Sequence, residues 1–82
     1  MTEGTIQNRK IKELEKDGYY VIKLVKTNKN GIPDIIAIPK DSGVLFCEVK
    51  TPNGRLSKLQ EYRLKELSEH GCRTEVYRGG DL

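Results

Sequence analysis

The sequence has little of several residue types that would have narrowed its function at once. It has no tryptophan, one phenylalanine, one histidine and only two cysteines, Cys47 and Cys72. These cysteines and His70 lack the spacing of a zinc site, and free cysteines suit a reducing compartment. No apolar run approaches the ~20 residues that cross a bilayer, and the start lacks the layout of a signal peptide. We therefore expect a cytoplasmic protein with no membrane association.

The size and charge of the chain set further bounds. Its 82 residues, of which 35% are hydrophobic and 33% charged, have room for a single domain, which we expect to span residues 1–82. A core this lean makes an isolated monomer marginal, so association between copies is the expected source of extra burial. The net charge of +3 is compatible with a polyanionic partner but does not establish one.

Residue patterns predict six elements in the order αβββαβ, which is an α/β fold whose helices cover one sheet. The expected elements are a helix over residues 3–17, strands over 19–25, 34–38 and 44–50, a helix over 57–71, a strand over 72–77 and a frayed tail over 79–82. Thr2 is the expected N-cap of the first helix and Gly18 its stop. Ser57 and Gln60 fit a capping box at the start of the second helix. Three leucines, Leu59, Leu64 and Leu67, are expected to form its buried side.

The most informative residues are three charged ones on the second and third strands. Residues two apart in a strand point to the same face, so Glu48 and Lys50 project together while Cys47 and Val49 face away. If the two strands pair as a hairpin, Asp34 begins one strand close to Glu48 on the other. Two carboxylates and one ammonium group then converge at one edge of the sheet.

This arrangement suits a divalent metal, although a second explanation exists. Carboxylate oxygens are hard ligands for Mg²⁺ or Mn²⁺, and Lys50 could orient the attacking water or stabilise charge on phosphorus. For an isolated E-x-K pattern, however, a solvated strand face with a turn aspartate is the more common case. The surrounding residues decide between the two.

Those surrounding residues resemble the VRR-NUC branch of the PD-(D/E)xK nuclease superfamily. The resemblance is carried by Gly31–Asp34, Phe46–Lys50, Gly54–Ser57 and Gln60, and it extends from the helix of Glu3 to the final strand. It implies a restriction-endonuclease-like core with a mixed four-stranded sheet in the order αβββαβ. It also implies a metal-dependent phosphodiesterase.

The resemblance implies a role for individual residues. Asp34, Glu48 and the backbone carbonyl of Val49 would hold Mg²⁺ or Mn²⁺, and Lys50 would be the catalytic lysine. Glu3 matches an acidic residue of the first helix that helps to hold the metal or its waters. Gln60, the last member of the implied catalytic set, matches a glutamine that borders the active site.

Two of these assignments have structural alternatives. Gln60 fits a capping box as well as an active-site role. Glu3 is also an ordinary negative charge at a helix N-terminus. Gln7, one turn after Glu3 on the same helical face, could line the same pocket. For Cys47 we expect a small core residue, and for His70 a position at a helix end.

Four basic residues flank the expected site. Lys26 and Lys29 precede Pro33, and Arg55 and Lys58 follow Lys50. They could contact phosphates on either side of the scissile bond, or they could simply be solvated. No recognition helix or zinc finger is present, so we expect cleavage selected by DNA structure rather than by sequence.

The leading hypothesis is therefore a divalent-metal-dependent DNA endonuclease. Small stand-alone members of the family resemble Holliday-junction resolvases that act as homodimers, and this form suggests a phage or mobile-element origin. The final strand, Tyr19, Tyr20 and Tyr77 are candidates for the dimer interface, although each tyrosine is also an ordinary half-buried aromatic. The alternatives are a catalytically silent DNA-binding module of the same fold and a small structural or interaction protein.

Overall fold

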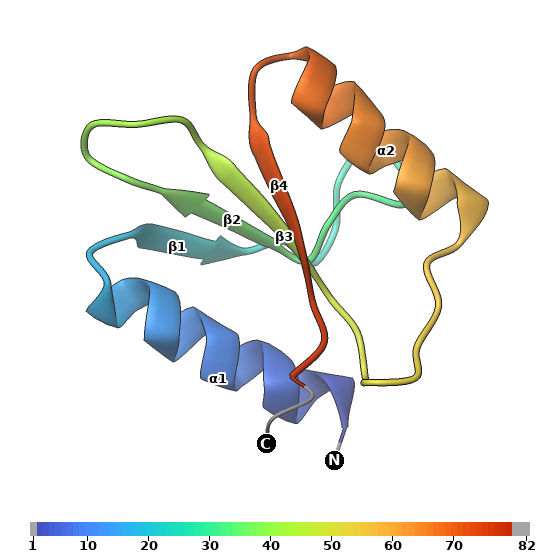
Figure 1. The fold of residues 1–82 in the computed structure, drawn as a ribbon, viewed down its shortest axis with the longest axis horizontal. Coiled ribbons are helices and arrows are strands. Elements are labelled where there is room, and N and C mark those ends of the chain that lie inside the picture. Colours follow the sequence, from blue (N-terminus) through green and yellow to red (C-terminus); the bar gives the residue numbers. More distant parts are fainter. Residues whose placement is uncertain (1, 80–82) are drawn as a thin grey trace.

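The computed structural model describes residues 2–79 and has the six predicted elements in the predicted order (Figure 1). They are α1 (Glu3–Lys16), β1 (Tyr20–Lys23), β2 (Ile35–Ile38), β3 (Leu45–Val49), α2 (Lys58–Glu69) and β4 (Arg73–Tyr77). The strands are one to three residues shorter than expected, and residues 80–82 of the expected tail lie outside the described part. No helix in the described residues is long and apolar enough to cross a membrane.

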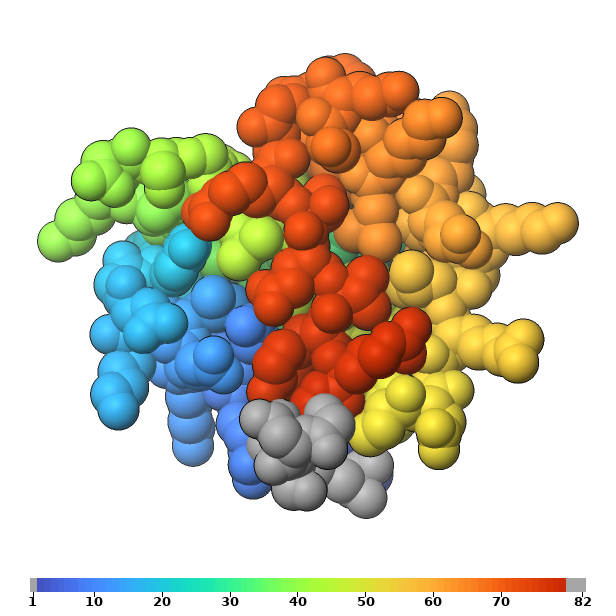
Figure 2. Space-filling view, in the orientation of Figure 1, coloured from blue at the N-terminus to red at the C-terminus, as the bar shows by residue number. Residues whose placement is uncertain are grey.

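The strands form one mixed sheet in the order β1-β2-β3-β4. β1 pairs with β2 and β2 with β3 in antiparallel fashion, whereas β3 and β4 are parallel. The parallel pair requires a crossover, which α2 provides. This confirms the α/β class, the mixed sheet and the predicted hairpin of the second and third strands. β4 is an edge strand, and Figure 2 shows it in red at the surface between α1 and α2.

α1 begins and ends where its capping residues predict. The Thr2 hydroxyl accepts a hydrogen bond from the Thr5 N–H at 3.2 Å, which satisfies one of the free N–H groups of the first turn. After the last helical residue, Gly18 adopts a φ of +93°, a conformation that a side chain would strain. The helix turns its apolar face, including Ile6 and Leu14, toward the sheet.

The fully buried apolar core lies on the α1 face of the sheet. Successive residues of a strand alternate between faces and directly paired residues share one, so the pairing of Ile35 with Cys47 places both on the same side. The residues of this core are Ile6, Leu14, Ile35, Ala37, Leu45, Cys47 and Val49. The core position predicted for Cys47 is confirmed, and its burial raises the pKa of the thiol to about 12.

α2 covers the opposite face of the sheet, and its packing differs from the prediction. The capping box is confirmed, because the Ser57 hydroxyl accepts from the Gln60 N–H at 3.1 Å. The expected buried side is only partly confirmed, because Leu64 and Leu67 are half-buried, Leu59 is 40% exposed and no residue of α2 is fully buried. One reason is the surface beneath the helix, because this face of the sheet carries the buried acid Glu48 among its apolar residues. The helix therefore rests on a partly polar surface.

Candidate active site

Asp34 lies at the start of β2, where two strands fix its position. Its backbone carbonyl accepts a hydrogen bond from the Leu24 N–H at 2.7 Å, next to β1. Its side-chain Oδ2 accepts one from the Val49 N–H at 2.9 Å, at the end of β3. Pro33, directly before it, is fully buried. The carboxylate is thus held at the edge predicted from the sequence.

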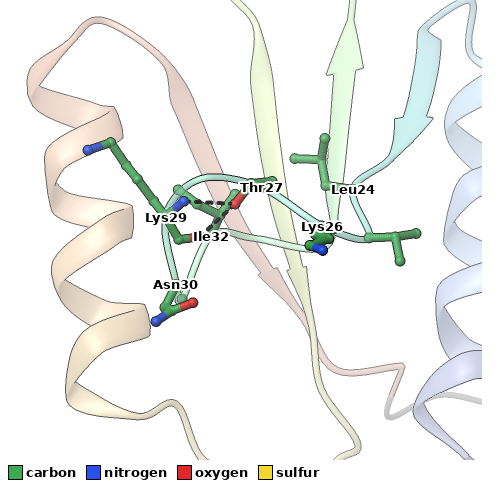
Figure 3. Close-up of a pocket in the computed structure, with 8 residues that line it drawn as sticks. Leu24, Lys26, Thr27, Lys29, Asn30 and Ile32 are labelled. Carbon is green, nitrogen blue, oxygen red and sulfur yellow. Dashed lines mark hydrogen bonds between the residues drawn. The ribbon is translucent and has the colours of Figure 1, made fainter.

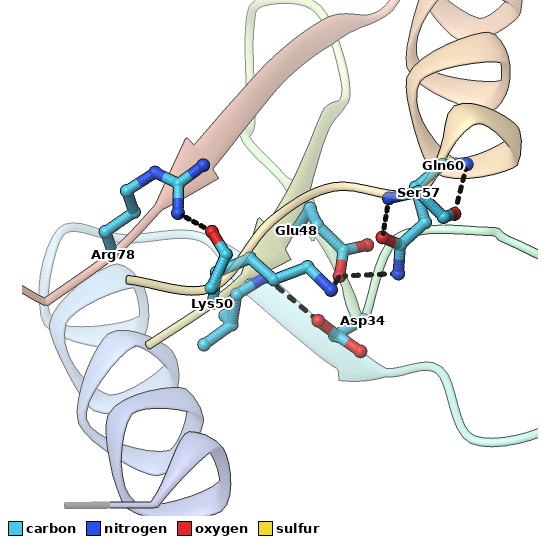
Figure 4. A network of polar contacts seen from close by, with 8 residues as sticks. Asp34, Glu48, Lys50, Ser57, Gln60 and Arg78 are labelled. Carbon is cyan, nitrogen blue, oxygen red and sulfur yellow. Dashed lines mark hydrogen bonds and ion pairs between the residues drawn. The ribbon is translucent and has the colours of Figure 1, made fainter. Parts of the chain in front are cut away.

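Glu48 is the centre of the polar network at this edge (Figure 4). It lies on the α2 face of β3 and is only 2% exposed. Its Oε2 lies 3.9 Å from the Lys50 Nζ and 3.4 Å from the Gln60 Nε2, which donates to it. The structure therefore brings together four predicted residues, Asp34, Glu48, Lys50 and Gln60, from three separate segments.

The environment of Glu48 favours its protonated form. Burial and then the negative charge of Asp34 raise the pKa of Glu48 to about 8, while Lys50 acts in the opposite direction. A carboxylate shifted this far by burial and a specific charged neighbour is a mark of functional sites. A positive charge placed between the two carboxylates would reverse the shift.

Lys50 is held at the site through its backbone. Its N–H donates to the Tyr77 carbonyl at 2.9 Å, which extends the parallel pairing of β3 and β4 by one residue. Directly after β4, Arg78 donates from Nη1 to the Gly54 carbonyl, which restrains the loop after Lys50. Neither anchor is visible in the sequence, because local residue patterns do not determine the register of a parallel strand pair.

Gln60 completes the capping box and also contacts Glu48, while its role in an active site stays a prediction. Its Oε1 accepts a hydrogen bond from the Ser57 N–H at 2.9 Å, which completes the capping box. Its Nε2 donates to Glu48. Because the amide oxygen is engaged at the cap, the amide nitrogen is directed at the carboxylate. The two ends of one amide therefore connect the start of α2 to the site.

Glu3 lies at the periphery of this network. It is the first residue of α1 and is exposed, and its negative charge is the smallest of the influences that raise the pKa of Glu48. Within residues 2–79, no group of three or more histidine, cysteine, aspartate or glutamate side chains is placed to hold a metal. Gln7, one turn further along α1, is buried. The role of Glu3 as a metal residue therefore stays a prediction.

The donor set nevertheless fits a divalent cation. Asp34 uses Oδ2 and Glu48 uses Oε2 for the contacts above, so Oδ1 and Oε1 remain as hard oxygen donors. Two carboxylates in a partly desolvated site repel each other, and a cation between them would remove that repulsion. Mg²⁺ commonly binds to only one or two carboxylates and keeps several waters, so two such ligands suffice.

The four predicted DNA-contacting residues fall into two groups. Arg55 and Lys58 are exposed on either side of Ser57, close to Gln60 and therefore to the site. Lys29 is also exposed, but it lines a hollow with Glu66 in the second half of α2 and with His70 at the end of that helix. Figure 3 shows the Lys29 side chain extending toward α2 while Lys26 lies elsewhere on the same loop. Arg55 and Lys58 therefore lie on the segment that leads to Gln60, Lys29 extends toward the far half of α2, and a DNA-contacting role stays a prediction for all four basic residues.

A buried lysine on α1 was missed from the sequence. Lys10 is 6% exposed, and its Nζ lies 3.4 Å from Glu75 Oε2 and 4.5 Å from the centre of the Tyr77 ring. The spacing in the sequence indicates this burial, because Lys10 lies four residues from both Ile6 and Leu14 and so shares their buried helical face. This group joins α1 to β4 on the face opposite Glu48.

Comparison with known proteins identifies the family. The VRR-NUC domain family model matches residues 2–81. A solved structure described as a VRR_NUC domain has a TM-score of 0.81 and 26% identity, over 93% of this chain and 83% of that one. A second, a VRR_NUC domain protein at 21% identity, has the same fold, with a TM-score of 0.80 over 99% of this chain and 80% of that one. No curated protein matches the chain. The chain belongs to the VRR-NUC family of nuclease domains.

Proposed function

We propose that the protein is a divalent-metal-dependent DNA endonuclease whose active site consists of Asp34, Glu48, Lys50 and Gln60. The observation that carries this proposal is the convergence of two carboxylates and a lysine at one sheet edge of a VRR-NUC fold. A purely structural cluster would gain nothing from a nearly inaccessible glutamate beside a second acid, because that arrangement costs desolvation energy.

In this proposal Asp34 and Glu48 hold Mg²⁺ or Mn²⁺, with the Val49 carbonyl as a further ligand and Glu3 beyond them. When bound, such a cation polarises the phosphate and makes water a better nucleophile at neutral pH. Lys50, whose side chain is 13% exposed, keeps a positive charge where negative charge gathers on the phosphate during attack. Gln60 holds the Glu48 carboxylate in one orientation. The products are a 5′-phosphate and a 3′-hydroxyl.

The exposed basic residues give the site a means of holding DNA. Arg55 and Lys58 lie on the loop and first turn that lead to Gln60, so they are placed to contact phosphates beside the scissile bond. Lys26 and Lys29 lie on another loop and would contact the backbone further away. Phosphate contacts position DNA without reading its sequence, which supports selection by DNA structure.

The finer part of the proposal is a homodimer that cuts four-way junctions. Two symmetry-related sites would allow paired cuts on two strands of a branched substrate. Surface for association exists at both sheet edges, because β4 is an edge strand and Tyr20 on β1 is 70% exposed. Tyr19 and Tyr77 are less suited to this, since both pack against the core.

A catalytically silent DNA-binding module is the second candidate. One observation favours it: in the described residues only Asp34 and Glu48 form the carboxylate group, and Lys50 already pairs with Glu48. Such a protein would bind branched DNA but give no product with any metal. A purely structural protein would show no salt-sensitive affinity for DNA at all.

A cleavage assay on a labelled four-way junction separates these functions. A linear duplex of the same sequence is tested in parallel with Mn²⁺, with Mg²⁺ and with a chelator, and the Lys50→Ala protein controls for contaminating nucleases. Paired, metal-dependent cuts across the junction support the full proposal. Equal cutting of both substrates retains the nuclease and discards junction selectivity. Binding without cutting by folded wild-type protein overturns the nuclease and favours the silent module.

A further inference from the structure

The loop between β1 and β2 is packed directly onto α2 (Figure 3). At Gly31, with a φ of +79°, an added Cβ would lie 2.7 Å from Leu59 Cγ. That distance leaves no room for a side chain, so the loop backbone itself contacts the helix. One residue earlier, the Asn30 carbonyl accepts a hydrogen bond from Arg63 Nε at 2.9 Å. Leu59 and Arg63 are four residues apart and lie on one face of α2.

The side chain of Arg63 is held in place by several contacts, so it can join α2 to the loop between β1 and β2. Its side chain is 17% exposed, and Nη1 donates to Glu66 Oε1 at 2.8 Å within the same helix. The guanidinium also lies over the Tyr62 ring, 5.6 Å from its centre. One nitrogen of the guanidinium is therefore fixed to the helix while another donates to the loop. A planar group with several donors is suited to such a bridge.

Both segments joined by Arg63 lead directly to the candidate site. Asn30 precedes Asp34 by four residues, and the buried Pro33 between them stiffens the connection. Gln60 precedes Arg63 by three residues, which is less than one helical turn. No residue of α2 is fully buried, so the position of this helix on the sheet depends on a small number of specific contacts. The bridge thus sets the spacing between the two sides of the site.

We propose that Arg63 is a positioning residue that couples the Asp34 segment to Gln60 and so fixes the geometry around Glu48. It touches neither carboxylate and acts through the loop and α2. Its role in catalysis rests on the proposed function, whereas its structural role does not. Without the bridge, α2 shifts on the sheet, and both the Gln60 contact to Glu48 and the Asp34 contact to Val49 change.

A matched control lies at the opposite end of the sheet. Arg73 donates from Nε and Nη2 to the Gly43 carbonyl, at 3.1 and 2.9 Å, and so forms a similar bridge between an arginine and a loop carbonyl. That bridge touches neither α2 nor the loop before Asp34, and the strands between it and the candidate site are held by their own pairing in the sheet. Arg63→Met and Arg73→Met therefore remove comparable contacts in different places. Arg63→Lys keeps the charge but loses the fork of donors.

Nuclear magnetic resonance tests the structural role proposed for Arg63 and does not require the protein to be active. In labelled protein, the Gln60 side-chain amide reports its bond to Glu48, and the Val49 backbone amide reports its bond to Asp34. We expect both signals to shift in Arg63→Met and to stay in place in Arg73→Met. Signals that move only within α2 and the loop, leaving Gln60 and Val49 unchanged, overturn the proposal. If Arg63→Met does not fold, Arg63→Lys provides the same comparison.

Cleavage kinetics test the catalytic half. We expect Arg63→Met and Arg63→Lys to lower kcat by about ten- to a hundredfold with little change in the KM for DNA, because small misplacements of reacting groups are costly. Arg73→Met should keep the wild-type kcat. A change confined to KM that Arg63→Lys restores would make Arg63 a phosphate contact and overturn the positioning role. If the wild type does not cut at all, the proposed function fails, and the resonance shifts alone decide the role of Arg63.

Discussion

The two faces of the sheet are built from similar strands but have different tasks. On the α1 face, Ile35, Cys47 and Val49 are completely buried beneath the helix. On the α2 face, Ile36 and Phe46 on the same strands are only partly covered. The residue most deeply buried on that second face is not apolar but is the acid Glu48.

Under the proposed function, the α1 face provides stability and the α2 face provides the catalytic groups. The α1 face contributes the apolar burial that keeps the sheet folded. The α2 face holds a desolvated acid, a nearby lysine and a capping glutamine, which is a poor way to stabilise a fold. Natural proteins break the rules of good packing mainly at functional sites. The comparison leads to four predictions, which follow from the largest expected effect to the smallest.

The largest effect is expected from changes to the charges of the α2 face. Lys50→Ala should lower metal-dependent cleavage by about a thousandfold, because it removes a charge that stabilises the transition state. Asp34→Asn should have a similar effect. Both proteins should stay folded and still bind DNA, as measured by circular dichroism and a gel-shift assay. Cleavage at the wild-type rate by either variant would contradict the assignment of the active site to this face.

Two neighbouring isoleucines compare the faces in terms of stability. Ile35→Ala should lower the free energy of unfolding by about 3 kcal/mol, because it leaves a cavity in the closed core. Ile36→Ala, on the α2 face, should cost only about 1 kcal/mol, since its side chain is already partly exposed. Urea denaturation measures both values. Equal losses in the two variants would contradict the asymmetry between the faces.

Substitutions of Gln60 can separate its contribution to helix capping from its contribution to cleavage. Gln60→Glu keeps an acceptor for the Ser57 N–H but replaces the donor to Glu48 with an oxygen. We expect cleavage to fall about a hundredfold with helix stability retained. Gln60→Ala should lose activity and also about 1 kcal/mol of stability, because the capping box loses the bond that the Gln60 side chain accepts from the Ser57 N–H. Full activity in Gln60→Glu, measured beside its melting temperature, would reduce Gln60 to a cap.

The last prediction concerns pH, whose effect is small within any one pH unit. The pKa of Glu48 is raised from 4.5 to about 8, first by burial and then by Asp34, so the folded protein binds a proton that the unfolded chain releases. Between these values stability should fall as pH rises, by on the order of 1 kcal/mol per pH unit. Urea denaturation in the presence of a chelator measures this slope. Glu48→Gln should remove it, and an unchanged slope in that variant would assign the effect to another group.

Much of this molecule follows from local sequence pattern. Thr2 and Ser57 predict the starts of the two helices, because their hydroxyls cap free N–H groups. Glu48 and Lys50 share a strand face by alternation alone, and the hairpin brings Asp34 to them. These features depend on short-range geometry, which a single sequence records well.

The features that escaped prediction depend on contacts between distant segments. The parallel register that anchors Lys50 to Tyr77 is set by the crossover through α2, not by a local motif. The burial of Lys10 depends on Glu75, which only the folded sheet places beside it. The incomplete burial of α2 follows from the partly polar face of the sheet on which it packs. Leucine spacing marks an apolar side but does not say how much of it is covered.

The central claim is that the buried acid of the α2 face serves chemistry and not stability. Its most direct test is Glu48→Gln, measured for Mn²⁺-dependent DNA cleavage and for urea unfolding in the same preparation at pH 7. We predict that cleavage is lost, while the free energy of unfolding is equal to or higher than that of the wild type. A variant that cuts DNA at the wild-type rate, or one that loses its fold, would contradict this account.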